Sequence, residues 1–224
     1  MSILEAKNLS IEIDGNKIIT NLSFELDEGD FLCIVGENGS GKTTLIKAII
    51  GEIQAKKGLK FSNLKRSEIG YISQRSQISE IFPASVTEIV CSGSLNSSSF
   101  GLRYSKETKD KAKQALLDLK IQNLADRSFS ELSGGQKQKV LLARALMATK
   151  KLIILDEPSN NLDKKSRAEL YELLNQINKH GIAIIMVTHD LDHGNLIGNK
   201  ILSLSGKLPF FGTVDEYVER IHHA

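Results

Sequence analysis

The segment from Phe31 to Ile50 constrains the fold more than any other part of the chain. It opens with five consecutive apolar residues, 31–35, which is typical of a strand buried on both faces. A glycine-rich turn follows, and the stretch from Lys42 to Ile50 has a helical pattern. The sequence therefore predicts a buried strand, a tight turn and a helix in direct succession.

The same style recurs later in the chain and predicts an α/β fold with a mostly parallel sheet. Apolar runs at 152–155, 182–187 and 201–204 resemble the first strand. Helical patterns lie between the runs, and two groups of residues each fall on one helical face: Ala112, Ala115, Leu116 and Leu119, then Leu170, Leu173, Leu174 and Ile177.

We expect one domain over residues 1–224, since this length suits a single domain with a sub-domain. Before the first buried run, alternating segments at 10–13, 17–19 and 21–26 predict antiparallel strands, the first two joined by a turn at 14–16. Residues 76–132 are rich in helical patterns and predict a helical sub-domain inserted into the α/β core, which comprises residues 1–75 and 133–224.

Composition excludes several classes of protein. The 29 basic and 27 acidic residues are mixed along the chain, Trp is absent, and only 5% of residues are aromatic, so neither a basic patch nor a stacking platform for nucleic acid is indicated. No apolar stretch approaches the roughly 20 residues that span a bilayer. Any role at a membrane therefore requires a partner that holds the chain there.

The glycine-rich turn matches the P-loop pattern Gly-x4-Gly-Lys-Ser/Thr. Its glycines allow backbone N–H groups to turn inward around phosphate oxygens, and the next helix adds its positive N-terminal end. Lys42 places a positive charge at the β- and γ-phosphates, and the Thr43 hydroxyl can hold Mg²⁺. A chance Gly/Ser turn is the alternative, which the flanking strand and helix oppose. The predicted ATP-binding residues are Gly36, Glu37, Asn38, Gly39, Ser40, Gly41, Lys42, Thr43 and Thr44.

A second acidic feature follows the apolar run 152–155, where a predicted strand ends in Asp156 and Glu157. Asp156 at the strand tip is suited to the Mg²⁺ shell, and Glu157 is the better candidate for the general base that polarises the attacking water. Taken alone, the acidic pair could equally be a strand-to-loop turn without a catalytic role. The P-loop upstream favours the catalytic interpretation over that alternative.

The residues Leu132-Ser133-Gly134-Gly135-Gln136 resemble the signature motif of ABC ATPases. They lie between the P-loop and the acidic pair, just before a helical run at 140–147. The resemblance implies that the Ser133 hydroxyl and the Gly135 N–H meet the γ-phosphate held by another subunit, with Gly134 and Gln136 beside them. A Ser-Gly-Gly helix cap is the alternative, and it leaves the remaining matches unexplained.

Those matches appear in the family's order along almost the whole chain. Gln74 is similar to the Q-loop glutamine, residues 160–163 to the D-loop that ends in Asp163, and His189 to the switch histidine. The resemblance implies that Gln74 senses Mg²⁺ and water and that His189 contacts the γ-phosphate. It also implies a head-to-tail homodimer in which each ATP lies between the P-loop of one copy and the signature of the other.

One position departs from the pattern of many family members. An aromatic residue ahead of the P-loop commonly stacks on adenine, and Ile13 stands near that place. An aliphatic side chain packs on a base more weakly than a ring. We expect Ile13 to contact the base with lower affinity, while the phosphate site is unaffected.

Two further segments are similar to the ATPases of zinc and manganese importers: 81–90, with the string Phe-Pro-x-Ser-Val-x-Glu-x-Val, and 208–217. This resemblance implies an ATP hydrolase at the cytoplasmic face of the membrane, paired with a separate permease and, indirectly, an extracytoplasmic solute-binding protein. The structural alternative for the first segment is a generic Pro-capped helix whose buried face comprises Val86, Ile89 and Val90. Two other functions remain open: import of another substrate such as a metal chelate, and a soluble ABC ATPase of cofactor assembly. The signature and His189 oppose a P-loop kinase or GTPase.

Overall fold

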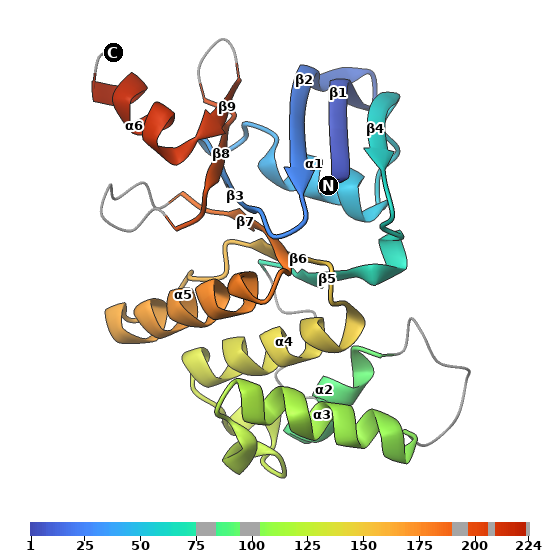
Figure 1. Cartoon of the computed structure of the whole chain (residues 1–224), viewed down its shortest axis with the longest axis vertical. Helices are drawn as coiled ribbons and strands as arrows, with labels where there is room; N and C mark the ends of the chain where they lie inside the picture. Colours follow the sequence, from blue (N-terminus) through green and yellow to red (C-terminus); the bar gives the residue numbers. More distant parts are fainter. Residues whose placement is uncertain (75–83, 95–103, 190–196, 206–208, 223–224) are drawn as a thin grey trace.

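Two β-sheets and six α-helices make up the chain in a computed structural model, which describes residues 1–74, 84–94, 104–189, 197–205 and 209–222. Figure 1 shows the small sheet and α1 at one end, the large sheet in the middle, and α5, α4, α3 and α2 at the other end. This layering places the larger sheet between two groups of elements, as the buried apolar runs predict.

The large sheet has the strand order β5-β6-β7-β3-β8-β9. Neighbours from β5 to β8 run parallel, and only β9 pairs antiparallel, with β8. The predicted mostly parallel sheet is therefore confirmed. Its strands are β3 (Phe31–Val35), β5 (Ile69–Ile72), β6 (Leu152–Asp156), β7 (Ala183–Val187), β8 (Lys200–Ser203) and β9 (Phe210–Thr213).

The small sheet is antiparallel in the order β2-β1-β4, with β1 at Ser2–Ile13, β2 at Asn16–Asp27 and β4 at Lys57–Phe61. Asp14 and Gly15 both have positive φ, 49° and 81°, which suits a two-residue hairpin turn. The strands are longer than the sequence pattern suggests because register shifts along β1 break the strict alternation. The pattern does not reveal β4 either.

The helices are α1 (Lys42–Ile50), α2 (Val86–Ser92), α3 (Lys106–Asp118), α4 (Gly134–Ala148), α5 (Lys164–Lys179) and α6 (Val214–His222). Four of them begin at a side chain that accepts a hydrogen bond from the first turn, a strong local start signal: Ser85, Ser105, Ser133 and Asp163. Short 3₁₀ turns lie at Arg66–Glu68, Gln122–Leu124 and Phe129–Glu131.

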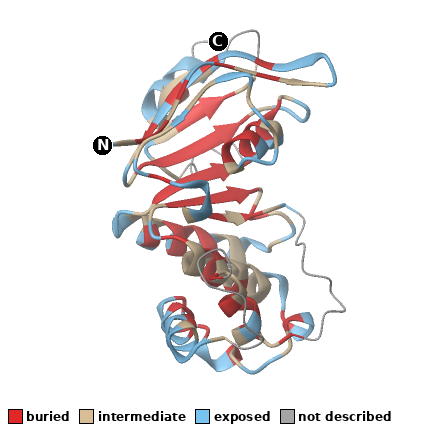
Figure 2. Ribbon diagram, turned by 90° about the vertical axis from the view of Figure 1, so that its right-hand side faces the viewer, coloured by how far each residue is buried: buried red, intermediate tan, exposed pale blue. Residues whose placement is uncertain are grey.

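Each strand of the large sheet feeds two hydrophobic cores. In β3, Leu32 and Ile34 join a core with the small sheet and α1, whereas Phe31, Cys33 and Val35 join a core with α2 to α5. Successive side chains of a strand point to opposite faces, and Figure 2 shows the central strands buried throughout. Burial on both faces explains why the run is continuously apolar.

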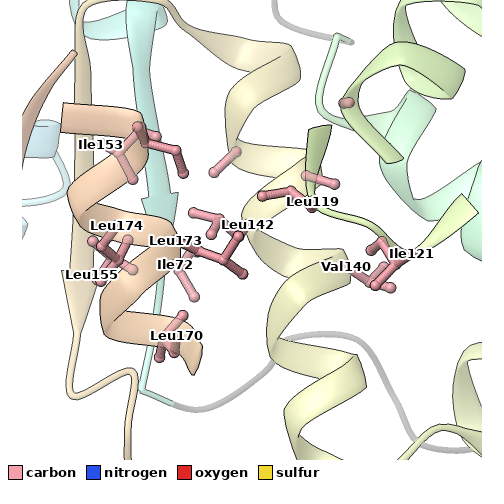
Figure 3. Packing of buried hydrophobic residues seen from close by; sticks show 14 of the residues in the cluster. Ile72, Leu119, Ile121, Val140, Leu142, Ile153, Leu155, Leu170, Leu173 and Leu174 are labelled. Carbon is pink, nitrogen blue, oxygen red and sulfur yellow. The ribbon is translucent and has the colours of Figure 1, made fainter. Parts of the chain in front are cut away.

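The second core holds the helical layers against the sheet. Leu170, Leu173 and Leu174 of α5 lie over Ile153 and Leu155 of β6 (Figure 3). On the other side of α4, Val140 lies close to Ile121 in the same view. Burial confirms both predicted helical faces. Among the described residues, no helix is long and apolar enough to cross a membrane.

Candidate nucleotide-binding site

The predicted site residues gather at one edge of the large sheet. β5, β6, β7 and β3 are consecutive parallel neighbours, so their carboxyl ends share one edge. Ligands of open α/β sheets bind at this edge. Gln74 follows β5, Glu157 follows β6, His189 follows β7 and the P-loop follows β3. Four segments that are distant in sequence are thereby brought together.

The P-loop backbone depends on its last glycine, Gly41. Gly41 is the N-cap of α1 with φ 96°, a left-handed conformation that side chains disfavour. A Cβ there would lie 3.2 Å from Ile19 Cγ1 and 3.3 Å from Ile18 Cγ2, closer than ordinary packing allows. Gly41 therefore lets the loop turn tightly against β2 and into the helix.

Two P-loop side chains suit an anion. The Lys42 ammonium is buried and donates to the Gly36 and Glu37 carbonyls at 2.7 and 2.8 Å. The Ser40 hydroxyl oxygen is buried and has no hydrogen-bond partner among the described residues. A buried hydroxyl without a partner costs free energy, and a phosphate oxygen would satisfy it. The residues present fit the phosphates of ATP.

Asp156 and Thr43 form the candidate metal pair. Asp156 is only 2% exposed, at the end of β6. Burial and the nearby Glu157 charge raise the pKa of its carboxyl, while a hydrogen bond from Thr43 and the charge of Lys42 act in the opposite direction. A carboxylate and a hydroxyl held together are hard oxygen ligands of the kind Mg²⁺ prefers. This donor set fits Mg²⁺.

Glu157 is held by groups from three strand ends. Its φ is +51°, and its N–H donates to the Val187 carbonyl at 3.0 Å. Gln74 Nε2 donates to Glu157 Oε2 at 2.6 Å, and His189 Nδ1 lies 3.8 Å from Glu157 Oε1. Asn160 Nδ2 also donates to Oε2. The structure thus brings together three of the four predicted catalytic residues, Gln74, Glu157 and His189, while Lys42 lies in the P-loop. It also adds a contact from Asn160, a residue of the D-loop-like segment 160–163 whose hydrogen bond to Glu157 the sequence did not predict.

The signature residues lie at the start of α4. Ser133 accepts from the Gln136 N–H, and Gln136 Oε1 accepts from the Ser133 N–H at 3.0 Å, a capping box. Ser133 and Gly134 are exposed. A Cβ at Gly135 would lie 2.9 Å from Ser166 Oγ, so α4 packs closely on α5 here. The alternative of a Ser-Gly-Gly helix cap is thus present, and the exposed Gly134 leaves the end of the helix accessible.

Asp163 serves as the N-cap of α5 in the structure. Its carboxylate accepts from the Ser166 N–H and hydroxyl, each at 2.9 Å. These hydrogen bonds lower the pKa of Asp163. The local geometry gives this residue a helix-starting role, and its predicted contact with nucleotide stays a prediction.

The region predicted for the base contains two aliphatic residues, Ile13 and Ile18, and Ile18 lies against the P-loop. Ile13 is half-buried at the end of β1, and Ile18 is 38% exposed. Ile18 lies beside Gly41, although the sequence pattern did not single it out. An exposed isoleucine beside the phosphate loop offers an apolar surface to a bound base or ribose.

Comparison with known proteins agrees with this geometry. The family model described as "ABC transporter" matches residues 19–160. A probable metal transport system ATP-binding protein of Chlamydia muridarum is 36% identical over 222 residues, which covers 97% of this chain and 94% of that protein. The zinc uptake system ATP-binding protein ZurA of Listeria innocua is 33% identical over 224 residues, covering 96% and 87% respectively.

A solved structure of an ATP-binding cassette in its ADP conformation has the same fold. The ADP conformation of an ATP-binding cassette from an ABC transporter has a TM-score of 0.85 and 25% sequence identity, covering 98% of this chain and 95% of that one. The predicted family and the P-loop ATPase fold are confirmed. The chain belongs to the ABC transporter family, as one of its nucleotide-binding, ATP-hydrolysing subunits.

Proposed function

We propose that this chain energises zinc uptake through a separate membrane permease by binding and hydrolysing ATP. The observation that carries the ATPase part is the convergence of the P-loop, Gln74, Glu157 and His189 on one sheet edge. The cargo is inferred from relatives named as metal or zinc transport ATPases. The chain then acts at the cytoplasmic face of the membrane without crossing it.

In this mechanism the protein positions ATP and handles one proton. The P-loop N–H groups and Lys42 hold the phosphates, and Thr43 and Asp156 hold Mg²⁺, which supplies charge neutralisation when bound. Glu157 takes a proton from the attacking water. His189 donates toward the γ-phosphate from the neighbouring strand end. Positioning and charge stabilisation account for most of the rate enhancement.

The proposed active form contains two copies of the chain, paired head to tail. Ser133 and Gly134 are exposed at the start of α4, and Gly135 packs against Ser166 of α5 within its own copy. A helix N-terminus attracts anions, so this accessible end suits the γ-phosphate of a facing copy. The signature of each copy then completes the ATP site of the other.

The permease is proposed to dock beside α2. A cavity of about 220 Å³ opens between β5, α2 and α4, and its lining includes Tyr71, Gly93 and Arg144. Arg144 Nε donates to Ser92 Oγ at 3.1 Å across this cavity. Because β5 leads directly to Gln74, a segment seated here would reach the ATP site through one short strand. An extracytoplasmic solute-binding protein would act through that permease.

The subfamily resemblance points in the same direction as the relatives. In segment 81–90, residues 81–83 lie outside the described part of the chain, while Ser85 and Glu88 form a capping box and Val86, Ile89 and Val90 are buried. These three residues therefore form the buried face of an ordinary helix, which was the structural alternative for this segment. The names of the relatives therefore support zinc more directly than this segment does.

Metal uptake by cells tests the proposal. A strain lacking this gene is given zinc, manganese and iron radioisotopes, alone and after complementation with wild type or Glu157→Gln. We expect a selective loss of zinc uptake that wild type restores and Glu157→Gln does not. Comparable amounts of both proteins in the membrane fraction provide the control.

Other outcomes would redirect the proposal. Selective loss of manganese or iron uptake would contradict zinc and retain transport. Normal uptake of every metal, together with failure to co-purify a polytopic membrane protein, would contradict the transport role and favour a soluble ABC ATPase.

A further inference from the structure

The two oxygens of the Glu157 carboxylate have different surroundings. Oε2 accepts two hydrogen bonds, from Gln74 Nε2 at 2.6 Å and from Asn160 Nδ2. Oε1 faces His189, whose Nδ1 lies 3.8 Å away. The side chain is only 13% exposed, so its surroundings limit how it can turn. One oxygen thus accepts from two amide donors, and the other faces His189, whose side chain is 60% exposed.

The turn after β6 holds Asn160 in this position. Glu157 has φ +51°, and the Asn160 N–H donates to the Glu157 carbonyl at 3.3 Å. The side chain of Asn160 then reaches back to the carboxylate three residues earlier. Because a carboxylate only accepts hydrogen bonds, the asparagine must present its NH₂ group. Donors to an ionised group make the stronger class of hydrogen bond.

We propose that Asn160 is a positioning residue for Glu157: its amide fixes Oε2, so that Oε1 is the oxygen that receives the proton from the attacking water. The inference rests on the proposed role of Glu157 as general base. In the step, the water oxygen bonds to the γ-phosphorus, one water proton passes to Oε1, and the bond from the γ-phosphorus to the leaving ADP oxygen breaks. Asn160 neither gains nor loses a proton.

Gln74 does not make this role redundant. It is exposed and follows a different strand, β5, so its contact with Glu157 depends on a second segment of the chain. Asn160 is on the same short turn as Glu157 and is half-buried, so its contact depends on no distant segment. Asn160 is therefore the local donor that restricts rotation of the Glu157 carboxylate.

Two substitutions of similar shape test the contact. Asn160→Leu removes both polar atoms, and Asn160→Asp replaces the donor with a second negative charge. ATP hydrolysis is measured on the purified chain and on the complex with the permease that co-purifies. We expect kcat to fall about 10- to 100-fold in both variants, since a hydrogen bond to a charged group is lost. The dissociation constant for ATP should stay close to that of wild type.

The control is Asn123→Asp, which makes the same change of charge at an exposed residue in the 3₁₀ turn Gln122–Leu124. It should hydrolyse ATP as wild type does. A kcat of Asn160→Leu equal to wild type would overturn the inference. So would a fall in kcat that appears only together with lost ATP affinity or a lower melting temperature, because that pattern indicates a structural role.

Glu157→Gln separates this inference from the function on which it depends. If Glu157→Gln hydrolyses ATP normally, the proposed base is wrong and the inference falls with it. If Glu157→Gln is inactive while Asn160→Leu is fully active, only the inference is wrong. A residue that acts through Glu157 should be non-additive with it: Asn160→Leu should not reduce the residual single-turnover rate of Glu157→Gln any further, and an additive loss would contradict the inference.

Discussion

The buried polar side chains at the two ends of β3 differ in their hydrogen-bond partners. At the carboxyl end, beyond Val35, the Ser40 hydroxyl is buried without a partner among the described residues, and the Lys42 ammonium donates to two carbonyls of its own loop. At the amino end, Asp30 is buried within a set of hydrogen bonds. At one end of β3, polar groups are therefore available to a ligand. At the other end, they are hydrogen-bonded within the chain.

The amino end illustrates full satisfaction of buried polar groups. Asp30 accepts from the Asp27 N–H at 2.7 Å and from Asn199 Nδ2 at 2.9 Å, and it pairs with Lys200 Nζ at 2.8 Å. The Phe31 N–H in turn donates to Asn199 Oδ1 at 2.7 Å. These contacts join the start of β3 to the start of β8.

The difference indicates where the fold is stabilised and where it functions. Groups at the amino end find partners inside the chain and so contribute to folding. At the carboxyl end, the Ser40 hydroxyl has no partner among the described residues and keeps hydrogen-bonding capacity that a ligand can use. Substitutions at the amino end should change stability with little effect on ATP, and substitutions at the carboxyl end should do the reverse.

The largest expected effect is that of Lys42→Ala. Removing the ammonium from the phosphates should weaken ATP binding about 10- to 100-fold, the range expected for charge-assisted hydrogen bonds. Isothermal titration calorimetry measures the change. Lys200→Ala is the matched control at the other end of the sheet, and it should lower the melting temperature while it retains ATP affinity. Intact ATP affinity in Lys42→Ala would contradict the assignment of the phosphate site.

Asp30→Asn should reduce stability without reducing catalysis. The substitution keeps the shape of the side chain but loses the ion pair with Lys200, which should lower the free energy of unfolding by about 1–3 kcal/mol. Denaturant titration measures the loss, and kcat for ATP should match wild type. A large fall in kcat with unchanged stability would break the contrast between the two ends.

The pH dependence of the free energy of unfolding should also reveal the contribution of Asp30. Burial raises the pKa of the Asp30 carboxyl, but hydrogen bonds from Lys200 and Asn199 more than offset this, so the pKa lies below its ordinary value. The contribution of Asp30 to stability is therefore complete above the unfolded-state pKa of about 4 and is lost as pH falls through the lower folded-state pKa. As pH falls, the free energy of unfolding of Asp30→Asn should decrease less steeply than that of wild type. Identical slopes would exclude this contribution.

The smallest expected effect is a gain at the ligand end. Ile13→Tyr supplies a ring where the chain has an aliphatic side chain, and stacking on adenine should tighten ATP binding about 2- to 10-fold. Binding of GTP, measured in parallel, shows whether the ring also alters base selectivity. Unchanged affinity for both nucleotides would place the base elsewhere, with Ile18 as the next candidate.

Much of the fold follows from patterns that the sequence displays directly. The strand Phe31–Val35 and the helix Lys42–Ile50 have the predicted bounds, because burial on both faces and the turn chemistry act locally. β4 was not predicted, since Lys57–Phe61 alternates weakly and is a strand only through its pairing with β1. Tertiary pairing of this kind leaves no periodic signal.

The candidate site shows the same division. The acidic strand end predicts Glu157, and the resemblance to ABC ATPases predicts Gln74 and His189. The parallel order of their strands explains why the three residues lie together. The segment 160–163 was recognised as similar to the D-loop, but the contact of Asn160 with Glu157 could not be predicted, because it depends on the positive φ of Glu157. A backbone conformation that side chains rarely adopt is visible only in a structure.

Glu157→Gln provides the most direct test that this sheet edge hydrolyses ATP. The amide keeps the size of the side chain but cannot accept the proton from water. With Mg²⁺-ATP, the variant should bind nucleotide, accumulate as an ATP-containing dimer in size-exclusion chromatography with light scattering, and show no steady-state turnover above background. Hydrolysis at the wild-type rate would contradict the account, because the proton would then have to leave the water by another route.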